Sequence, residues 1–269
     1  MAEYDDFDLE DYRDRPVDAK EIDAQAAIGN FFEQNREKVY FSRQVEVLHE
    51  DVFFHWVSNR AIRDLVEEGK ILGETRKLST GAEIHFLWHR RYRFYKRSAK
   101  RLIELVEKYA DPNIGTALGL HGEMMVLAGF AKSQFVMRGC NTREFNGTVW
   151  TETGHDLDFI FERDSVSYGV EVKNMLGYME YGEFTVKIRL CQHLGLRPVF
   201  VARMLPKTWI KGLIDKGGYA MVLKYQLYPW THREIATQVA RELGLPVDAP
   251  RALADRTMEK FNRWHEKNV

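Results

Sequence analysis

The sequence predicts a mixed α/β fold, and three observations lead to this prediction. Residues 154–175 contain two short runs rich in Phe, Ile, Val and Tyr, separated by a polar cluster, as in a β-hairpin. The segment that follows alternates between helical and strand patterns. Hydrophobic residues make up 45% of the 269 residues, which is ample for sizeable cores. A chain of this length is expected to form about two domains.

The N-terminal part is predicted to contain three helices and then a β-hairpin. The helical patterns cover residues 21–38, 41–50 and 53–69. Ser42 is the candidate cap of the second helix. The strand patterns cover residues 70–78 and 82–91. The third helix is predicted to bury an apolar face consisting of Phe54, Val57, Ala61 and Leu65.

This order of elements resembles a winged helix-turn-helix module. The resemblance implies that the outer face of the third helix engages duplex DNA and that the hairpin contacts phosphates. The DNA-binding residues that it implies are Asn59, Arg60, Arg63, Arg76, Lys77, Arg90 and Arg91. Two alternatives stay open, because a winged helix can also be a protein–protein module or a dimerisation device.

The distribution of charge favours a nucleic-acid partner, although the formal net charge is only −1. Ten Lys or Arg and two acids lie between Lys70 and Arg101, whereas residues 1–24 hold ten acids and three bases. This asymmetry predicts a basic surface with an acidic tail elsewhere. The basic residues 93–112 are predicted to form a helix that links two domains.

Residues 113–229 are predicted to form an α/β sandwich. Helical patterns cover residues 115–135, 182–195 and 206–218, and further strand patterns cover 197–205 and 219–229. The helix at 182–195 carries Lys187, Arg189 and Gln192, which are expected on a solvated face; the alternative is that they approach the acids of the hairpin. Residues 230–269 are predicted to be helical, with a capping box at Thr231 and Glu234. This extension either packs on the preceding domain or forms a dimer contact.

Acidic side chains interrupt the predicted hairpin. A turn centred on Asp164 and Ser165 places Asp158 opposite Glu171, and Asp156 opposite Lys173. Alternation gives a core face of Leu157, Phe159, Phe161, Tyr168, Val170 and Val172. Opposed like charges destabilise a sheet by roughly 0.2–1 kcal/mol, so a compensating Mg²⁺ is expected. The alternative is a surface hairpin in which Asp156 pairs with Lys173.

Glu123 lies on the apolar stripe of the helix predicted at 115–135. Its neighbours at helical spacing are Leu120, Val126, Leu127 and Phe130. A carboxylate in such a stripe is costly unless it is paired, so Glu123 is predicted to join the acids of the hairpin. The alternative is a glutamate at the edge of the stripe whose carboxylate reaches water.

The acidic strand, the turn and the Val-Glu-Val-Lys sequence at 170–173 resemble the active-site core of the PD-(D/E)XK nucleases, the restriction-endonuclease-like superfamily. The name-giving proline is absent, and His155 and Asp156 stand near its place. The resemblance implies that Asp158 and Glu171 hold Mg²⁺, that Mn²⁺ can substitute, and that Lys173 positions the attacking water. Glu123 would hold a metal-bound water or a second ion. The implied catalytic residues are Glu123, Asp158, Glu171 and Lys173.

The expected architecture is an N-terminal winged helix domain followed by a restriction-endonuclease-like α/β sandwich core and C-terminal helices. The expected segments are an acidic flexible tail, the winged helix domain, a basic linker helix, the nuclease domain and a helical extension. Their expected boundaries are 1–20, 21–92, 93–112, 113–229 and 230–269. The function that this architecture implies is hydrolysis of duplex or branched DNA by a monomer or a homodimer.

Two other functions stay open: a DNA-binding regulator or adaptor with a catalytically silent nuclease-like domain, and an RNA-directed nuclease. No uninterrupted apolar run approaches the roughly 18 residues of a membrane helix. The acidic N-terminus is also unlike a signal peptide, so a cytoplasmic protein is expected. Cys140 and Cys191 lie far apart without a Cys-x-x-Cys pattern, so neither zinc nor a disulfide is expected.

Overall fold

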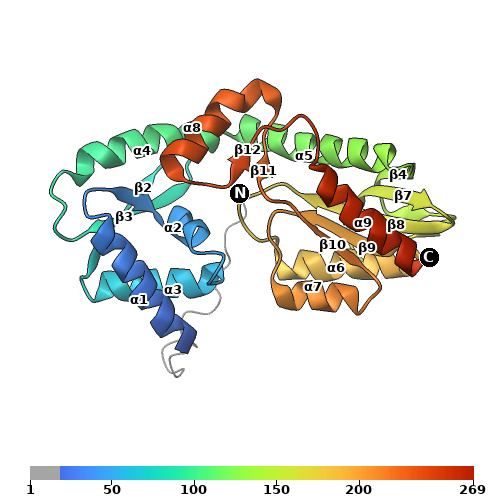
Figure 1. The fold of residues 1–269 in the computed structure, drawn as a ribbon, viewed down its shortest axis with the longest axis horizontal. Helices are drawn as coiled ribbons and strands as arrows, with labels where there is room; N and C mark the ends of the chain where they lie inside the picture. Colours follow the sequence, from blue (N-terminus) through green and yellow to red (C-terminus); the bar gives the residue numbers. More distant parts are fainter. Residues whose placement is uncertain (1–18) are drawn as a thin grey trace. The chain divides into compact units, whose positions relative to one another are not determined.

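The computed structural model describes residues 19–269, which divide into two compact units at Leu105 and Val106 (Figure 1). Each unit has its own hydrophobic core and is described by itself. The acidic tail expected at residues 1–20 lies almost entirely outside the described residues, and Ala19 already begins the first helix. The mixed α/β fold that the sequence predicts is confirmed.

The first unit contains three helices and a three-stranded antiparallel sheet. Its elements are α1 (Ala19–Gln34), β1 (Val39–Phe41), α2 (Ser42–Leu48), α3 (His55–Glu67), β2 (Ile71–Lys77) and β3 (Glu83–His89). The sheet order is β1-β3-β2, and Phe41 of β1 lies opposite Phe86 of β3. The three helices and the hairpin agree with the sequence prediction, whereas the short strand β1 was not predicted.

The core of the first unit lies between α1, α3 and the sheet. Phe32, Val57, Leu65 and Leu87 are all buried in it. Ser42 is not the cap of α2. The cap position is Phe41, whose backbone N–H donates to Gln44 Oε1 at 3.3 Å, because a glutamine three residues on can reach back to it.

The second unit is a five-stranded mixed sheet with helices on both faces. Its larger elements are α5 (Pro112–Lys132), β4 (Val136–Thr142), β7 (Leu157–Arg163), β8 (Val166–Lys173), α6 (Tyr181–His193), β9 (Arg197–Ala202), α7 (Lys207–Ile214), β10 (Tyr219–Val222), α8 (Arg233–Leu243) and α9 (Asp255–Asn268). Helix α4 (Tyr95–Tyr109) crosses the division between the units. The sheet order is β10-β9-β8-β7-β4, with β8, β9 and β10 parallel and β7 antiparallel to both neighbours.

Short elements complete the second unit. They are β5 (Glu144–Phe145), β6 (Thr148–Val149), β11 (Gln226–Leu227), a 3-10 turn (Trp230–His232) and β12 (Val247–Asp248). Helix α8 begins at Arg233 directly after the 3-10 turn, so the capping box expected at Thr231 and Glu234 does not form. The Thr231 hydroxyl instead lies 3.0 Å from the ring of His232.

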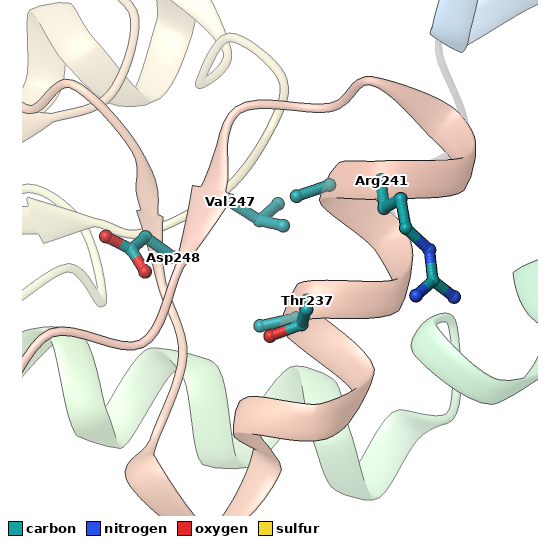
Figure 2. A pocket seen from close by; sticks show the side chains of 6 residues that line it. Thr237, Arg241, Val247 and Asp248 are labelled. Atoms are coloured by element: carbon teal, nitrogen blue, oxygen red, sulfur yellow. The ribbon is translucent and has the colours of Figure 1, made fainter.

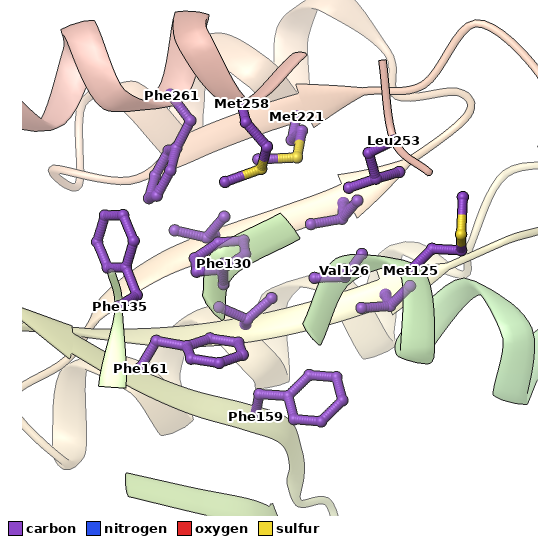
Figure 3. Close-up of a cluster of buried hydrophobic side chains, with 14 of the residues drawn as sticks. Met125, Val126, Phe130, Phe135, Phe159, Phe161, Met221, Leu253, Met258 and Phe261 are labelled. Carbon is purple, nitrogen blue, oxygen red and sulfur yellow. The ribbon is translucent and has the colours of Figure 1, made fainter. Parts of the chain in front are cut away.

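Helices α5 and α9 pack on one face of the sheet, and α6 and α7 pack on the other (Figure 1). Figure 3 shows the cluster on the first face, where Phe130 of α5, Phe161 of β7 and Phe261 of α9 meet. The rings of Phe130 and Phe161 stack at 4.4 Å. The C-terminal helix therefore packs on the sheet, which is one of the two arrangements that the sequence left open.

The hairpin of β7 and β8 has the predicted register. Phe159 lies opposite Val170, and the connecting residues Asp164 and Ser165 have φ angles of 52° and 62°. Two successive positive φ angles are typical of a type I′ turn, whose twist matches that of the strands. One residue of the predicted core face is misplaced: Leu157 packs in the cluster facing α6, because it precedes the paired part of the hairpin and its side chain lies beside Gly169.

Helix α5 is the one helix in residues 19–269 that is long and apolar enough to cross a membrane, judged by length and composition alone. The apolar residues of α5 do not form an uninterrupted run, because Asn113, Thr116, His121 and Glu123 interrupt them. Met125, Val126 and Phe130 of α5 are buried in the cluster on the sheet.

Candidate active site

The predicted catalytic residues of the hairpin lie at the end of β8 that leads toward α6. Glu171 is buried and its neighbour Lys173 is partly buried. The paired part of the hairpin ends at Phe159 and Val170, one step before Asp158 and Glu171. Beyond that point the Asp158 side chain continues the contact between the strands, because its Oδ2 accepts a hydrogen bond of 2.6 Å from the N–H of Val172.

Two lysines neutralise Glu171. Lys173 Nζ lies 3.0 Å from Glu171 Oε1, and Lys187 Nζ of α6 lies 2.7 Å from Glu171 Oε2. The second contact is an ion pair by distance but lacks the angles of a directed hydrogen bond. Lys173 also pairs with Glu183 of α6 at 2.8 Å. Glu171 is therefore compensated by ammonium groups from its own strand and from α6.

Lys187 was expected on a solvated face, and this expectation is wrong; the alternative describes it, since Lys187 lies against Glu171. Its side chain is only 6% exposed and donates to the carbonyl oxygen of Asp156 at 2.5 Å. The sequence held a signal for this position, since Lys187 lies three residues after Phe184 and four before Cys191, which are both buried. Arg189, in contrast, is exposed and pairs with Glu152.

The pairing of Asp156 with Lys173 that the surface-hairpin alternative requires is not present. The carboxylate of Asp156 lies 3.9 Å from Lys187 Nζ, and Lys173 contacts Glu171 and Glu183. Glu171 is 2% exposed, so this part of the hairpin is a covered site.

Burial raises the pKa of Asp158 and of Glu171. Desolvation is the main cause for Glu171, and the nearby charge of Asp158 raises its pKa further. Desolvation also raises the pKa of Asp158, although the hydrogen bond from Val172 opposes the shift. Burial alone would lower the pKa of Lys173, but the charges of Glu171 and Glu183 outweigh it and raise this pKa well above its usual value. Lys173 is consequently a permanent cation at neutral pH.

Helix α5 brings Glu123 into this group. Desolvation and then the charge of Glu171 raise the pKa of Glu123, and Glu123 in turn raises the pKa of Asp158. The helix can approach because residue 122 is glycine: a Cβ at Gly122 would lie 2.7 Å from the Cβ of Asn174. Asp158, Glu171 and Lys173 thus lie together at one end of β8, and α5, which carries Glu123, packs beside them where Gly122 meets Asn174.

Asn174 fixes the backbone around the site. Its side-chain amide donates to the carbonyl oxygens of Leu118 in α5 and Leu227 in β11, at 2.8 and 2.7 Å. Its Oδ1 accepts from the N–H of Leu227 at 2.7 Å. This residue was not predicted from the sequence. Its position directly after Lys173 was the available signal, since Asn can bond several backbone groups at once.

Within residues 19–269, no three His, Cys, Asp or Glu side chains converge in the arrangement of a metal site. Mg²⁺ needs only one or two carboxylates, with waters and substrate oxygens as the other ligands. Asp158 and Glu171 meet that requirement, and Glu171 Oε2 is buried without a directed hydrogen bond. The two carboxylates therefore fit Mg²⁺, provided that Lys187 moves away from Glu171 Oε2 so that this oxygen can bind the metal.

The predicted DNA-binding residues of the first unit do not form one patch. Arg76 and Lys77 lie at the turn of the hairpin, whereas Arg90 and Arg91 follow its other end, roughly 20 Å along the strand. Asn59 donates to Glu46 at 3.0 Å, Arg60 pairs with Glu21, and Arg76 pairs with Glu74 at 2.8 Å. The exposed residues of the set are Arg63, Lys77, Arg90 and Arg91.

A shallow surface hollow of about 400 Å³ lies between α8 and β12 (Figure 2). Thr237 and Arg241 line it from α8, and Val247 and Asp248 line it from β12. None of the predicted catalytic residues borders it, so the hollow is a feature separate from the carboxylate group.

The chain was compared with protein-family models, with curated proteins and with solved structures, and nothing matched it.

Proposed function

We propose that the protein is a metal-dependent DNA endonuclease that hydrolyses phosphodiester bonds. In this proposal Val106–Val269 is a catalytic unit of the PD-(D/E)XK type, and the first unit is a winged helix that engages duplex DNA. One observation carries the proposal: Asp158 and buried Glu171 are adjacent on a hairpin, with Lys173 two residues further on the same side. Two carboxylates that lie side by side away from water lower the stability of the folded protein. Such pairs are often found where the protein binds a metal ion.

Asp158 and Glu171 are the residues that would hold Mg²⁺, with Mn²⁺ as a substitute. A metal ion bound there would polarise the scissile phosphate and lower the pKa of a coordinated water. Lys173 is cationic at neutral pH, so it would orient the water and stabilise negative charge rather than accept a proton. Glu123 has a raised pKa and lies beside the group, which suits a residue that holds a water molecule.

The order of elements in the first unit supports the winged helix. Helix, short strand, two helices and two strands follow one another, and the first strand pairs with the third. The exposed guanidinium of Arg63 on α3 is suited to contact a phosphate. Because Asn59 and Arg60 are engaged with Glu46 and Glu21, this unit would grip the backbone of DNA rather than read its bases.

A second candidate function is a DNA-binding adaptor whose nuclease-like unit is silent. The observation that favours it is the full neutralisation of Glu171 by Lys173 and Lys187. A carboxylate with two ammonium partners can be a purely structural ion pair.

Cleavage of supercoiled plasmid by the full chain separates the two candidates. The parent should nick or linearise the plasmid with Mg²⁺ and not with EDTA. Glu171→Gln should reduce the rate by about a thousandfold, because a metal ligand contributes several kcal/mol to the transition state. Glu152→Gln removes an exposed acid that pairs with Arg189 and should leave the rate unchanged. Equal cleavage by Glu171→Gln would exclude the proposed site, and an inactive parent would favour the adaptor.

A further inference from the structure

An exposed tryptophan in the second unit carries two arginines. Trp230 is 47% exposed, and the guanidinium carbons of Arg233 and Arg251 lie 4.5 and 4.8 Å from the centre of its ring. We call these three residues the Trp230 cluster. Within residues 19–269, neither guanidinium forms an ion pair with a carboxylate. Two cations therefore share one indole without an anion to balance them.

The backbone explains why these residues meet. Strands β11 and β12 are parallel, with Gln226 beside Val247 and Leu227 beside Asp248. The two segments stay together beyond the strands, since the N–H of Tyr228 donates to the carbonyl oxygen of Asp248 at 2.7 Å. Trp230 and Arg251 follow at the same spacing, and Arg233 begins α8 immediately after the 3-10 turn.

Strand β11 is hydrogen-bonded to Asn174, next to the candidate active site. Asn174 directly follows Lys173 and holds Leu227 through two hydrogen bonds of 2.7 Å. The Gln226 side chain adds a third bond, to the carbonyl oxygen of Asn174 at 3.1 Å. Leu227 and Trp230 are three positions apart, a stretch of chain that spans at most about 10 Å. The Trp230 cluster is thus connected to the end of β8 that carries Lys173 through a short stretch of hydrogen-bonded backbone.

We propose that the Trp230 cluster binds an unpaired nucleotide of a DNA strand beside the bond that is cut, a substrate assignment that rests on the proposed function. An indole offers its face to a nucleobase, and guanidinium groups bind phosphate in a planar, bidentate manner. A nucleotide supplies both a π face and an anion, and the two arginines have no carboxylate partner within residues 19–269. Bases inside a duplex are stacked on each other, so the cluster selects strands that are unpaired next to the cleavage point.

Binding measured in EDTA tests this without requiring cleavage. Fluorescence anisotropy would compare a labelled oligo-thymidine strand with a labelled duplex of equal length, using the full chain. Trp230→Leu should weaken binding of the single strand about tenfold, because each stacked base contributes that much or more, and should leave the duplex unaffected. Trp230→Phe should restore most of the affinity. Arg251→Gln should also weaken binding of the single strand. The control Arg241→Gln, which removes one positive charge from α8, should leave this binding unchanged.

Equal single-strand affinity for Trp230→Leu and the parent would overturn the inference, as would a parent that binds no single strand or binds only oligo-uridine. The plasmid experiment with Glu171→Gln gives an independent result. If the Trp230 cluster binds single strands but the parent cleaves no plasmid, the proposed nuclease activity is wrong and the role of the cluster stands. If the parent cleaves plasmid but Trp230→Leu leaves single-strand affinity unchanged, the role of the cluster is wrong and the nuclease activity stands.

Discussion

Lys187, together with Lys173, provides the positive charge that balances Glu171. Its ammonium group lies between Glu171 Oε2 and the carbonyl oxygen of Asp156, in a place with almost no exposure to water. Removal of one partner from a buried ion pair typically costs about 3–5 kcal/mol, because the other charge stays behind without compensation. A cation that binds at Glu171 would therefore have to replace the contribution of Lys187 as well as add its own.

The variant Asp158→Asn tests whether the negative charge of Asp158 lowers the stability of the folded protein, separately from whether Asp158 binds a metal ion. The amide oxygen can still accept from the N–H of Val172, so the variant loses a charge and little else. The pKa of Asp158 is raised in the folded state, so the folded protein holds its proton more tightly than the unfolded chain does. Its contribution to stability is full below the unfolded pKa and is lost as pH rises through the folded pKa.

We expect the free energy of unfolding in EDTA to be similar for parent and Asp158→Asn at the acid end of the range. The variant should become the more stable protein as pH rises past the ordinary pKa of an aspartate. Urea unfolding at several pH values measures the difference. Millimolar Mg²⁺ should then raise the melting temperature of the parent more than that of the variant. A variant less stable than the parent at neutral pH would mean that the carboxylate has a structural role.

Individual site residues were predictable from the sequence to different degrees. The register of the hairpin followed from the polar turn, because a two-residue turn fixes the pairing of the strands. Glu123 was found because a carboxylate stood out in an apolar stripe. Asn174 was missed and Lys187 was given only as an alternative, since a lysine on a helix and an asparagine after a strand are usually solvated. Only the packing of α6 and β11 against β8 shows that both are buried.

Close contacts between elements depend on two glycines. A Cβ at Gly169 of β8 would lie 2.6 Å from Cys191 Sγ, so glycine allows α6 to come near enough for Lys187 to reach Glu171. Gly122 does the same for α5 and Asn174. The site is thus assembled by the approach of two helices to one strand.

Gly122→Ala should destabilise the second unit by roughly 1–3 kcal/mol, because the new methyl group overlaps with Asn174 and forces the helix away. Gly119→Ala on the same helix has open space and should be neutral or stabilising by up to about 1 kcal/mol. Urea unfolding midpoints compare the two variants. A Gly122→Ala protein as stable as Gly119→Ala would show that α5 is not tightly held at the site.

At the level of elements, regular periodicity predicted most helices and strands of both units within a few residues, but the strand predicted at 219–229 is divided into β10 and β11, which belong to different sheets. The failures have physical causes. Strand β4 is an edge strand with a bulge and mostly exposed side chains, so it has no alternating pattern. Strand β1 is only three residues long. The start of α8 depends on the preceding 3-10 turn, which the Thr and Glu at capping-box spacing did not reveal.

The whole molecule combines two units with separate cores, so the two proposed activities can be tested separately. Arg63→Gln should reduce the dependence of duplex affinity on salt, by about 0.9 in the logarithmic slope for each phosphate that the protein no longer neutralises. Arg60→Gln should change the slope less, because Arg60 already pairs with Glu21. Anisotropy of a labelled duplex across a range of KCl concentrations measures the slope. An unchanged slope for Arg63→Gln would favour a protein-contact role for this unit.

The contacts of α9 also constrain the order in which the molecule is made. Both ring nitrogens of His265 form hydrogen bonds with the hairpin. Nδ1 lies 2.6 Å from the Tyr168 hydroxyl, and Nε2 lies 2.9 Å from Asp164 Oδ2 in the hairpin turn. Phe261 fills the cluster that Phe130 and Phe135 leave open on the sheet. A ribosome releases these residues after all the strands of the sheet. The part of the apolar face that α9 covers therefore stays exposed on the nascent second unit until translation has passed residue 265.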